Sequence, residues 1–403
     1  MTETITPAYT IAAEARADTL MVIVPEAISE WIRKGEVTDR YYNPGDLFRT
    51  VHLVLCNDDR PDPAIVQRLV GCARLHIHNA PRPPKFFLRT LGMRPALMKG
   101  WAEQIVALAR QVRPQLVRCH GALFNAYAAL RIQQTLGVPY AISLHINPDE
   151  DVRGREHDWK NRLYNQLTQG VERLSLRNAD MVMPVYQPIL PYLQRIGAPN
   201  VKVHYNVLNG RFLRPKEVYT LHCPARLIYV GRLFDLKDPT PIIDAIADLP
   251  DVVLTIVGDG PLRPALEAHA KGLGLSKRVI FRPAVPNDEL CSLLAESDLF
   301  VVHTEHWEIS KSVLEALLTG LPIVINRRRG APVPELTPDI VCLVDTSADA
   351  YRSAIRDLLE DDAARAALGR AALAAARAGW APAVTEAAVV ETYRALMQRA
   401  GTA

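Results

Sequence analysis

The sequence RLIYVGRLFDLKDPTPIIDAIADLPDVVLTIVGDGP, residues 226–261, decides the fold. Short runs rich in β-branched and aromatic residues stand near its two ends, at Arg226–Val230 and Val252–Val257, and both predict buried strands. Between them, Pro239–Asp248 has the apolar spacing of a helix. A strand, a helix and a second strand in this order predict a βαβ unit on a parallel sheet.

The same alternation continues on both sides of this stretch. Toward the C-terminus we predict strands at Val279–Arg282, Leu299–His303, Pro322–Ile325 and Val341–Val344, and helices at Leu262–Gly272, Asp288–Glu296, Ser310–Leu318, Ala348–Glu360, Asp361–Ala378 and Thr385–Arg399. Toward the N-terminus we predict strands at Leu20–Val24, Val51–Leu55, Leu116–Cys119, Tyr140–Leu144, Met181–Val185 and Val201–Tyr205, and helices at Trp101–Gln111, Leu123–Leu136 and Glu156–Asn178.

The segment Asn206–Pro224 breaks this rhythm and is interpreted as the interdomain connection. The predicted fold class is therefore α/β, with two doubly wound domains at residues 1–205 and 206–384. A last helix, within residues 385–403, is expected to return to the first domain. Two such domains would place a ligand cleft between them, at the carboxyl ends of both sheets.

Composition excludes several classes of protein. Of the 403 residues, 49% are hydrophobic and 23% are charged, which is typical of globular proteins and unlike disordered or collagen-like chains. No apolar run approaches the ~18–20 residues of a membrane span, and residues 1–18 lack the apolar region of a secretory signal. Six scattered cysteines indicate reduced thiols in a cytosolic protein. A net charge of +3 gives no indication of a nucleic-acid partner.

Charge is nevertheless unevenly spread. Between Pro63 and Pro148 the only acidic residue is Glu103, against eleven Lys and Arg. A field of one sign attracts anions such as phosphates, acidic sugars or anionic lipid; the alternative is a surface balanced by the rest of the chain. Within it, Pro81–Trp101 mixes large apolar residues with five basic ones. This segment fits a peripheral contact with anionic membrane, or else a lip of a cleft packed on its own domain.

Three elements in the second half suggest chemistry. Gly231-Arg232 ends a strand, and Lys237 follows just before a helix, so two cations stand where a diphosphate could bind. Gly258-Asp259-Gly260-Pro261 forms a tight turn between a strand and a helix. The segment Thr304–Ala316 leaves a strand and enters a helix with Glu308 and Glu315, whose carboxylates could accept hydrogen bonds from sugar hydroxyls. Taken singly, each also fits an ordinary surface loop, turn or solvated helix.

Together and in this order, these elements resemble the retaining glycosyltransferases of family 4, the group 1 glycosyltransferases. Gly320-Leu321-Pro322-Ile323-Val324 completes the similarity, which is strong over Arg226–Glu335 and looser in the N-terminal half. The resemblance implies a GT-B fold, in which two Rossmann-like domains face each other across a cleft. The N-terminal domain would then hold the acceptor, and the C-terminal domain the nucleotide sugar.

The resemblance also implies residue roles. Gly231, Arg232 and Lys237 would hold the donor diphosphate and stabilise the leaving nucleotide. Glu315 would bind the ribose hydroxyls, and Glu308 would lie near the donor sugar. His120 would lie beside the anomeric carbon or the acceptor. The implied catalytic residues are thus His120, Arg232, Lys237 and Glu308, and the implied donor-binding residues are Gly231, Arg232, Lys237, Glu315, Ser310 and Lys311.

The sequence departs from the family pattern in the acidic loop. Six residues separate Glu308 from Glu315 where the family has seven, so a gapless alignment puts Trp307 at the position of the first glutamate. Either the loop is one residue shorter here, or Glu308 is not the equivalent of that glutamate. Ile309 and Ser310 replace loop glycines, and Ser310 or Lys311 would supply the contacts instead.

Two other loops depart as well. Pro25-Glu26-Ala27 stands where relatives often have Gly-Gly, and Arg327-Arg328-Arg329 stands where they have a glycine-rich turn. The three arginines fit either an exposed loop or a grip on an anionic sugar or a phosphate-bearing acceptor.

Two groups of histidines lie outside these motifs. His76 and His78 alternate on a possible strand, but no third metal ligand is evident, so no metal site is predicted. His145 at a strand end either lines the cleft or is structural.

The resemblance predicts a metal-independent retaining transferase with no cofactor, which moves a sugar from a nucleotide-diphosphate donor to a glycan or lipid-linked acceptor in polysaccharide or glycoconjugate assembly. It would work in the cytoplasm, with peripheral contact at the inner face of the membrane through residues 81–101 as one interpretation. The alternatives are a non-catalytic GT-B scaffold or binding protein, and a GT-B sugar-nucleotide epimerase or phosphorylase. No nucleic acid is expected as a partner.

Overall fold

The structure is a computed structural model that describes residues 17–33, 37–150, 159–330 and 332–401. These residues divide into two compact units. The first unit contains the described residues up to Val207 and those from Thr385 onward, and the second contains Leu208–Val384. The chain thus changes unit after Val207 and after Val384, beside the boundaries at 205 and 384 that the sequence suggested.

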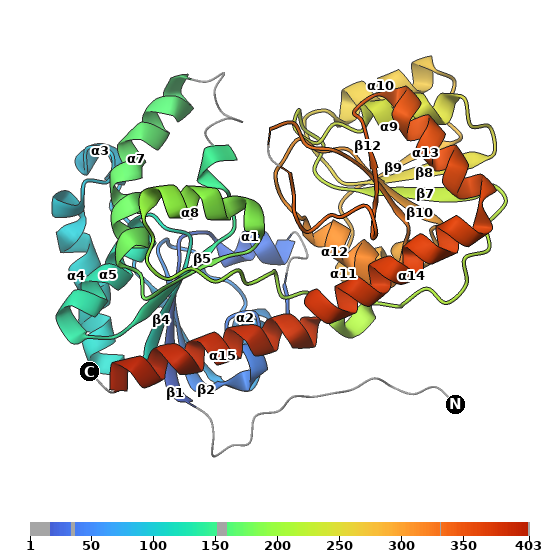
Figure 1. The fold of residues 1–403 in the computed structure, drawn as a ribbon. Coiled ribbons are helices and arrows are strands. Elements are labelled where there is room, and N and C mark those ends of the chain that lie inside the picture. The colour runs from blue at the N-terminus through green and yellow to red at the C-terminus, as the bar shows by residue number, and fades with distance from the viewer. Residues whose placement is uncertain (1–16, 34–36, 151–158, 331, 402–403) are drawn as a thin grey trace, which may run out of the picture. The chain divides into compact units, whose positions relative to one another are not determined.

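In the first unit, six parallel strands form one sheet in the order β3-β2-β1-β4-β5-β6. Its central strand is apolar along Leu20–Val24, and these residues are fully buried, as expected for a parallel sheet covered on both faces. Figure 1 shows the helices that flank it. The strands are β1 (Ala17–Val24), β2 (Phe48–Leu55), β3 (Arg74–Asn79), β4 (Leu116–His120), β5 (Tyr140–Leu144) and β6 (Met181–Pro184). The helices are α1 (Ile28–Arg33), α2 (Pro63–Val70), α3 (Phe86–Arg89), α4 (Pro95–Val112), α5 (Phe124–Leu136), α7 (Trp159–Asn178) and α8 (Leu190–Ile196).

The second unit has a parallel sheet in the order β12-β11-β10-β7-β8-β9. Counted from its first strand, this is the same doubly wound order as in the first unit, so the prediction of two Rossmann-like domains is confirmed. The strands are β7 (Ala225–Val230), β8 (Val252–Val257), β9 (Val279–Arg282), β10 (Leu299–Val302), β11 (Ile323–Asn326) and β12 (Cys342–Val344). The helices are α9 (Thr240–Ala247), α10 (Arg263–Gly272), α11 (Asn287–Ala295), α12 (Lys311–Thr319), α13 (Ala348–Glu360) and α14 (Asp362–Gly379).

One predicted strand is wrong. Residues Val201–Tyr205 run beside β6 but form only a single bridge, between Val182 and Val201. Lys202 and His204 donate backbone hydrogen bonds to β6 at 3.1 and 2.9 Å. Pro184, whose carbonyl accepts the second of these bonds, has no N–H to donate in return, so a regular ladder cannot form. The sixth strand is instead β3, at the opposite edge of the sheet.

The other differences concern helices. Four described helices of the first unit, α1, α2, α3 and α8, were not predicted, because each is only about one to two turns long. The last helix, α15 (Pro382–Gly401), begins three residues before its expected start, with Pro382 at its first position. The predicted beginning of the long helix at Glu156 lies outside the described residues, and α7 is described from Trp159. None of the described helices is both long enough and apolar enough to cross a membrane.

Candidate active site

Both units carry their candidate site residues at the same place in the sheet. The strand order changes direction between two neighbouring central strands, β1 and β4 in the first unit and β7 and β10 in the second. The connections that follow such a pair leave toward opposite faces, so a crevice opens at the carboxyl ends of the two strands. In doubly wound sheets, ligands bind in that crevice.

In the second unit, two glycines let the loop after β8 pack against the loop after β7. A Cβ at Gly258 would lie 1.9 Å from the carbonyl oxygen of Gly231, and a Cβ at Gly260 would lie 2.0 Å from that of Leu233. Gly258 also has φ +144°, which other residues rarely adopt. The glycine turn identified in the sequence therefore fixes the position of the loop that carries the expected diphosphate ligands.

Lys237 in this loop forms an ion pair with Glu308 from the loop after β10. Burial would raise the pKa of Glu308, but the charge and hydrogen bond of Lys237 outweigh it and lower the pKa. Both side chains are about one-fifth exposed, so a ligand can reach them. The hydroxyl of Tyr229 donates to the Lys237 carbonyl oxygen at 3.1 Å and fixes the backbone there. The structure thus brings two predicted catalytic residues into direct contact.

Arg232 lies in the same loop and is exposed. Its guanidinium lies 5.5 Å from the ring centre of Phe234, and the Phe234 ring lies 5.4 Å from that of His306. These ring contacts connect the loop after β7 with the loop after β10. A guanidinium held over a ring keeps its N–H groups available for phosphate oxygens.

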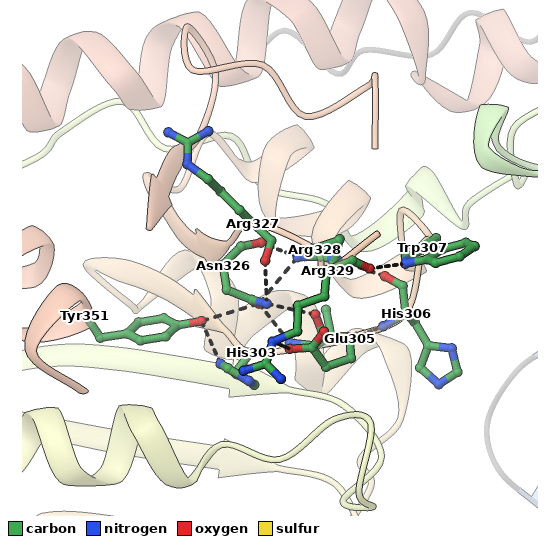
Figure 2. Close-up of polar contacts among 10 residues, drawn as sticks. His303, Glu305, His306, Trp307, Asn326, Arg327, Arg328, Arg329 and Tyr351 are labelled. Atoms are coloured by element: carbon green, nitrogen blue, oxygen red, sulfur yellow. Dashed lines mark hydrogen bonds and ion pairs between the residues drawn. The ribbon is translucent and has the colours of Figure 1, made fainter. Parts of the chain in front are cut away.

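The loop after β10 is attached to the loop after β11, as Figure 2 shows. The buried side chain of Asn326 accepts from Thr304 N–H at 2.9 Å and donates to the Thr304 carbonyl at 3.0 Å. Arg328 donates to the carbonyl oxygens of His306 and Asn326, at 2.8 and 2.5 Å. Trp307 donates through its indole to the Arg329 carbonyl at 2.8 Å. These contacts hold a loop in which the family's glycines are replaced.

The arginine run therefore divides into two roles. Arg328 is occupied by backbone carbonyls and stabilises the loop, a role that the sequence did not suggest. Arg327 is exposed, and Arg329 has a side chain 77% exposed, 4.0 Å from Glu305. The interpretation as an exposed loop fits these two residues.

Glu315 lies one turn into α12 and is only 6% exposed. Asn287 at the start of α11 donates to its carboxylate at 2.8 Å. Burial raises the pKa of Glu315 to about 7, although Lys311 and the hydrogen bond from Asn287 act in the opposite direction. A buried carboxylate with one protein donor retains lone pairs that can accept from a diol.

Ser310 and Lys311 begin the same helix. The Ser310 hydroxyl accepts from Val313 N–H at 3.4 Å and caps α12. Ser312 Oγ donates to the Val230 carbonyl at 3.1 Å, which ties the start of α12 to the end of β7. Ser310 therefore has a structural role in this state, and Lys311 is the group of the pair that a ligand could engage by charge.

In the first unit, His120 belongs to a cluster of rings at the end of β4. The Tyr41 hydroxyl lies 3.3 Å from Nε2 of His120 and 3.1 Å from Nε2 of His145. The centres of the two imidazole rings are 4.2 Å apart, and Trp31 contacts His120 edge-on at 5.1 Å. Nδ1 of His120 lies 3.4 Å from the carboxylate of Glu26, which follows β1. Tyr41 thus connects two histidines from neighbouring strands.

A buried cation supports this cluster. Arg118 is 5% exposed and donates to the Tyr41 carbonyl at 2.6 Å and to Ser143 Oγ at 3.2 Å. Its guanidinium lies 4.9 Å from the centre of the Tyr41 ring. These contacts fix Tyr41, and Tyr41 in turn orients both imidazoles.

The cluster forms one wall of a cavity of about 370 Å³ within the first unit. Both polar and apolar groups face it, among them Glu26, His120, His145, Tyr164, Glu172 and Arg173. The cavity is in the size range of small-molecule sites. His145 therefore lines a cavity of the first unit.

A third histidine joins His76 and His78. His52 on β2 pairs in register with His76, and its Nδ1 lies 2.9 Å from Nε2 of His78. The rings stack, with interplanar angles of 12–13° between His52 and each of the others, so their nitrogens do not converge on one point. Among the described residues, no group of three or more His, Cys, Asp or Glu is arranged to hold a metal ion.

Sequence reasoning did not identify Tyr41, Asn287 or His52 as parts of these clusters. None of them belongs to a local motif, and each contacts a residue at least 20 positions away. Glu26 carried one signal, because a charged residue directly after the first buried strand lies at the crevice of a doubly wound sheet.

Two family models match the chain. Residues 221–374 match the model described as glycosyl transferases group 1, and residues 46–207 match the glycosyl transferase 4-like domain. A 2-deoxystreptamine glucosyltransferase of Streptomyces kanamyceticus is 26% identical over 68% of this chain and 75% of its own length. A GDP-mannose-dependent phosphatidylinositol monomannoside mannosyltransferase of Mycolicibacterium smegmatis is 33% identical over 39% of this chain and 44% of its own.

Solved structures have the same fold. Sucrose-phosphate synthase from Thermosynechococcus elongatus superimposes with a TM-score of 0.70 at 16% identity, over 95% of this chain and 100% of that one. HepE of Anabaena, solved in complex with UDP, superimposes with a TM-score of 0.68 at 17% identity, over 94% and 100% of the two chains. At these identities the likeness shows the two-domain fold.

Proposed function

The chain belongs to the group 1 glycosyltransferases of family 4, and we propose that it is a retaining enzyme that moves a sugar from a nucleotide-diphosphate donor to a glycan or lipid-linked acceptor. The observation that carries the proposal is the pair of cations, Arg232 and Lys237, beside Glu308 at the crevice of the second unit. The role is assembly of a polysaccharide or glycoconjugate. No cofactor is required, since the donor is a co-substrate.

The diphosphate would bind at the loop after β7. Arg232 offers a planar fork to the phosphate oxygens, and Lys237 adds a point charge. Before the donor binds, Lys237 is ion-paired with Glu308. An arriving diphosphate would bind the Lys237 ammonium in place of Glu308, and the Glu308 carboxylate would then be released toward the donor sugar. Gly231 has no side chain at this strand end, which leaves room for the diphosphate. This exchange would couple donor binding to placement of the acidic loop.

The two cations would also make the leaving group better. Charge develops on the nucleotide phosphate as the glycosidic bond breaks, and fixed cations at that point lower the barrier. They would do the work that a metal ion does in other transferases. Retention would follow if the acceptor attacks from the face that the nucleotide leaves, with the donor phosphate assisting.

The acceptor would occupy the cavity of the first unit beside His120. HepE, which shares the fold, was solved with UDP, and the relatives named above act on an aminocyclitol and on a mannosylated phosphatidylinositol. A cavity with His120, His145, Glu26 and Arg173 on its wall suits a polyhydroxylated acceptor, because each group can exchange hydrogen bonds with hydroxyls.

Two alternatives from the sequence receive less support. A non-catalytic scaffold would not need the paired Lys237 and Glu308, and the named relatives are transferases. An epimerase or phosphorylase of the same fold would not couple release of free nucleotide to elongation of an acceptor. Measuring both products separates these activities.

A thermal-shift screen tests the donor site. The full chain is melted with UDP, GDP, ADP, CMP and their common sugars, with and without EDTA. One nucleotide diphosphate should raise the melting temperature by mass action, unaffected by EDTA, and Arg232→Ala should abolish the shift. Arg226→Ala, at the other end of β7, is the matched control and should keep the shift. No shift with any nucleotide, or an unchanged shift in Arg232→Ala, would contradict the proposal.

A further inference from the structure

A cluster of exposed leucines lies on the first unit, on α3, the turn after it, the start of α4 and α7. Among the described residues, ten large hydrophobic side chains are exposed, and five of them belong to this surface. They are Leu88 (67% exposed), Leu91 (57%), Leu97 (50%), Leu163 (46%) and Leu167 (39%). Single exposed leucines are common, but half of the total in one place indicates an interaction surface. We call these five residues the leucine surface.

The leucines on α7 adjoin those around α3, because α3 and the turn after it pack on α7. The rings of Phe87 and Tyr164 stack with centres 5.0 Å apart. Gly92 approaches α7 so closely that a Cβ there would lie 2.5 Å from the Cβ of Leu167. Figure 1 shows α3 beside α7 in the first unit.

In residues 86–101, buried side chains fix the backbone, and the leucines between them are held exposed. Phe86, Met93, Met98 and Trp101 are buried, and Thr90 Oγ donates to the Phe86 carbonyl at 2.8 Å. Leu91, between these anchors, has φ +48°, a conformation that an L residue adopts at a cost. The fold therefore holds Leu91 outward in a strained turn, and strain of this kind persists where the surrounding structure enforces it.

Basic side chains surround the leucines. Lys85, Arg89, Arg94 and Lys99 are all exposed, and residues 81–101 contain no acidic residue. Within the described part of the chain, no salt bridge involves any of these four cations. Their charge is therefore available to an external anion.

We propose that the leucine surface docks the first unit on an anionic lipid bilayer. The leucines would enter the boundary between headgroups and acyl chains, while Lys85, Arg89, Arg94 and Lys99 bind phosphates. A bilayer fits better than a protein partner, because exposed leucines interspersed with exposed cations match the acyl chains and the phosphates of lipid without a shape-matched counterpart. Resting on the proposed function, the surface also explains access: Tyr164, stacked on Phe87, lines the cavity beside His120, so a lipid-linked acceptor could reach it from the membrane.

Sedimentation with vesicles tests the proposal on the full chain. Vesicles of phosphatidylcholine with about 30% phosphatidylglycerol should bind the protein, and vesicles of phosphatidylcholine alone should bind it at least about tenfold less, since each basic residue near the surface adds attraction. The triple variant Leu88→Gln, Leu91→Gln, Leu97→Gln should lose at least about tenfold in binding to the anionic vesicles. The double variant Leu273→Gln, Ile280→Gln removes exposed apolar side chains of the second unit and should bind as the native chain does. Circular dichroism melting checks that both variants fold.

Three outcomes would overturn the inference. They are absent binding of the native chain to anionic vesicles, equal losses in the two sets of variants, or a triple variant that binds vesicles normally but no longer forms a dimer seen for the native chain. The last result would assign the leucine surface to a second copy. The donor-induced thermal shift is measured without lipid, so it separates failure of this inference from failure of the proposed function.

Discussion

The two units share one strand order but place different chemistry at the crevice between their central strands. In the second unit the crevice holds charges, with Lys237 paired to Glu308 and Arg232 exposed nearby. In the first it holds the phenol ring of Tyr41 and the imidazole rings of His120 and His145, and it opens into a cavity of about 370 Å³. Paired cations suit a diphosphate that must be bound and released, and rings beside a cavity suit a polyol that must be oriented. One scaffold thus serves two tasks through its loops.

The largest effect should come from the charged crevice. Lys237→Ala should lower kcat/KM by about 10²–10³, because it removes a cation from the point where charge develops. Arg226→Ala, on the strand that precedes this loop but at the end away from the crevice, should retain activity within about twofold. Steady-state kinetics with the nucleotide sugar found by the thermal-shift screen provides the measurement.

Lys237→Ala also leaves Glu308 without its counter-charge, so stability must be separated from catalysis. The single variant should melt at a lower temperature, because an unpaired carboxylate is left partly buried. The double variant Lys237→Ala, Glu308→Gln should recover the melting temperature but not the activity. Recovery of both the melting temperature and the activity would mean that Lys237 only neutralises Glu308. The second crevice would then not use its charge to bind a diphosphate, which would contradict the comparison of the two crevices.

The charged crevice was also the one that could be predicted from sequence. Gly231, Arg232 and Lys237 lie within seven residues, and Glu308 and Glu315 within eight, so each group forms a local motif. The ring cluster has no such motif, since Tyr41 is 79 residues from His120 and 104 residues from His145. Only the strand order brings these residues together. The sequence predicted the fold class but not the order of the individual strands.

The same reason explains the smaller errors. His52 joins His78 across 26 residues through the register of β2 and β3, and that register is not readable from one strand alone. Arg328 was interpreted as part of either an exposed loop or a grip on an anion, but its carbonyl partner His306 becomes visible only once the two loops are placed side by side. The sequence predicted repeating units well and contacts between distant loops poorly.

A smaller effect should come from the ring cluster. Tyr41→Phe should lower kcat/KM by about tenfold, because the lost hydroxyl leaves two imidazoles without their shared partner. As a positioning residue, Tyr41 should affect kcat and the pH profile more than the KM for the donor. Its neighbour Tyr42 is buried, and its hydroxyl has no hydrogen-bond partner within the described ranges, so Tyr42→Phe is the matched control and should be silent. Equal effects of the two variants would assign Tyr41 to packing alone.

The smallest effect should be a pH dependence in the second unit. Burial raises the pKa of Glu315 to about 7, so its stabilising contribution is full below its unfolded pKa of about 4.5 and is lost as the pH rises through about 7. Ribose hydroxyls need the ionised carboxylate as an acceptor, so nucleotide affinity should run the opposite way and rise about fivefold from pH 6 to pH 8. Calorimetric titration with the matching nucleotide diphosphate measures it.

Variants of Asn287 and Glu315 test whether Glu315 is the group that sets this pH dependence. Its hydrogen bond favours the ionised form of Glu315, so Asn287→Ala should raise the pKa further and move the midpoint of the affinity curve to higher pH. Asp288→Asn, an exposed change at the next position of α11, should leave the midpoint near pH 7. Glu315→Gln should give a flat curve. If nucleotide affinity still rises with pH in Glu315→Gln, another group in the second crevice titrates. The pH dependence would then not come from the Glu315 carboxylate.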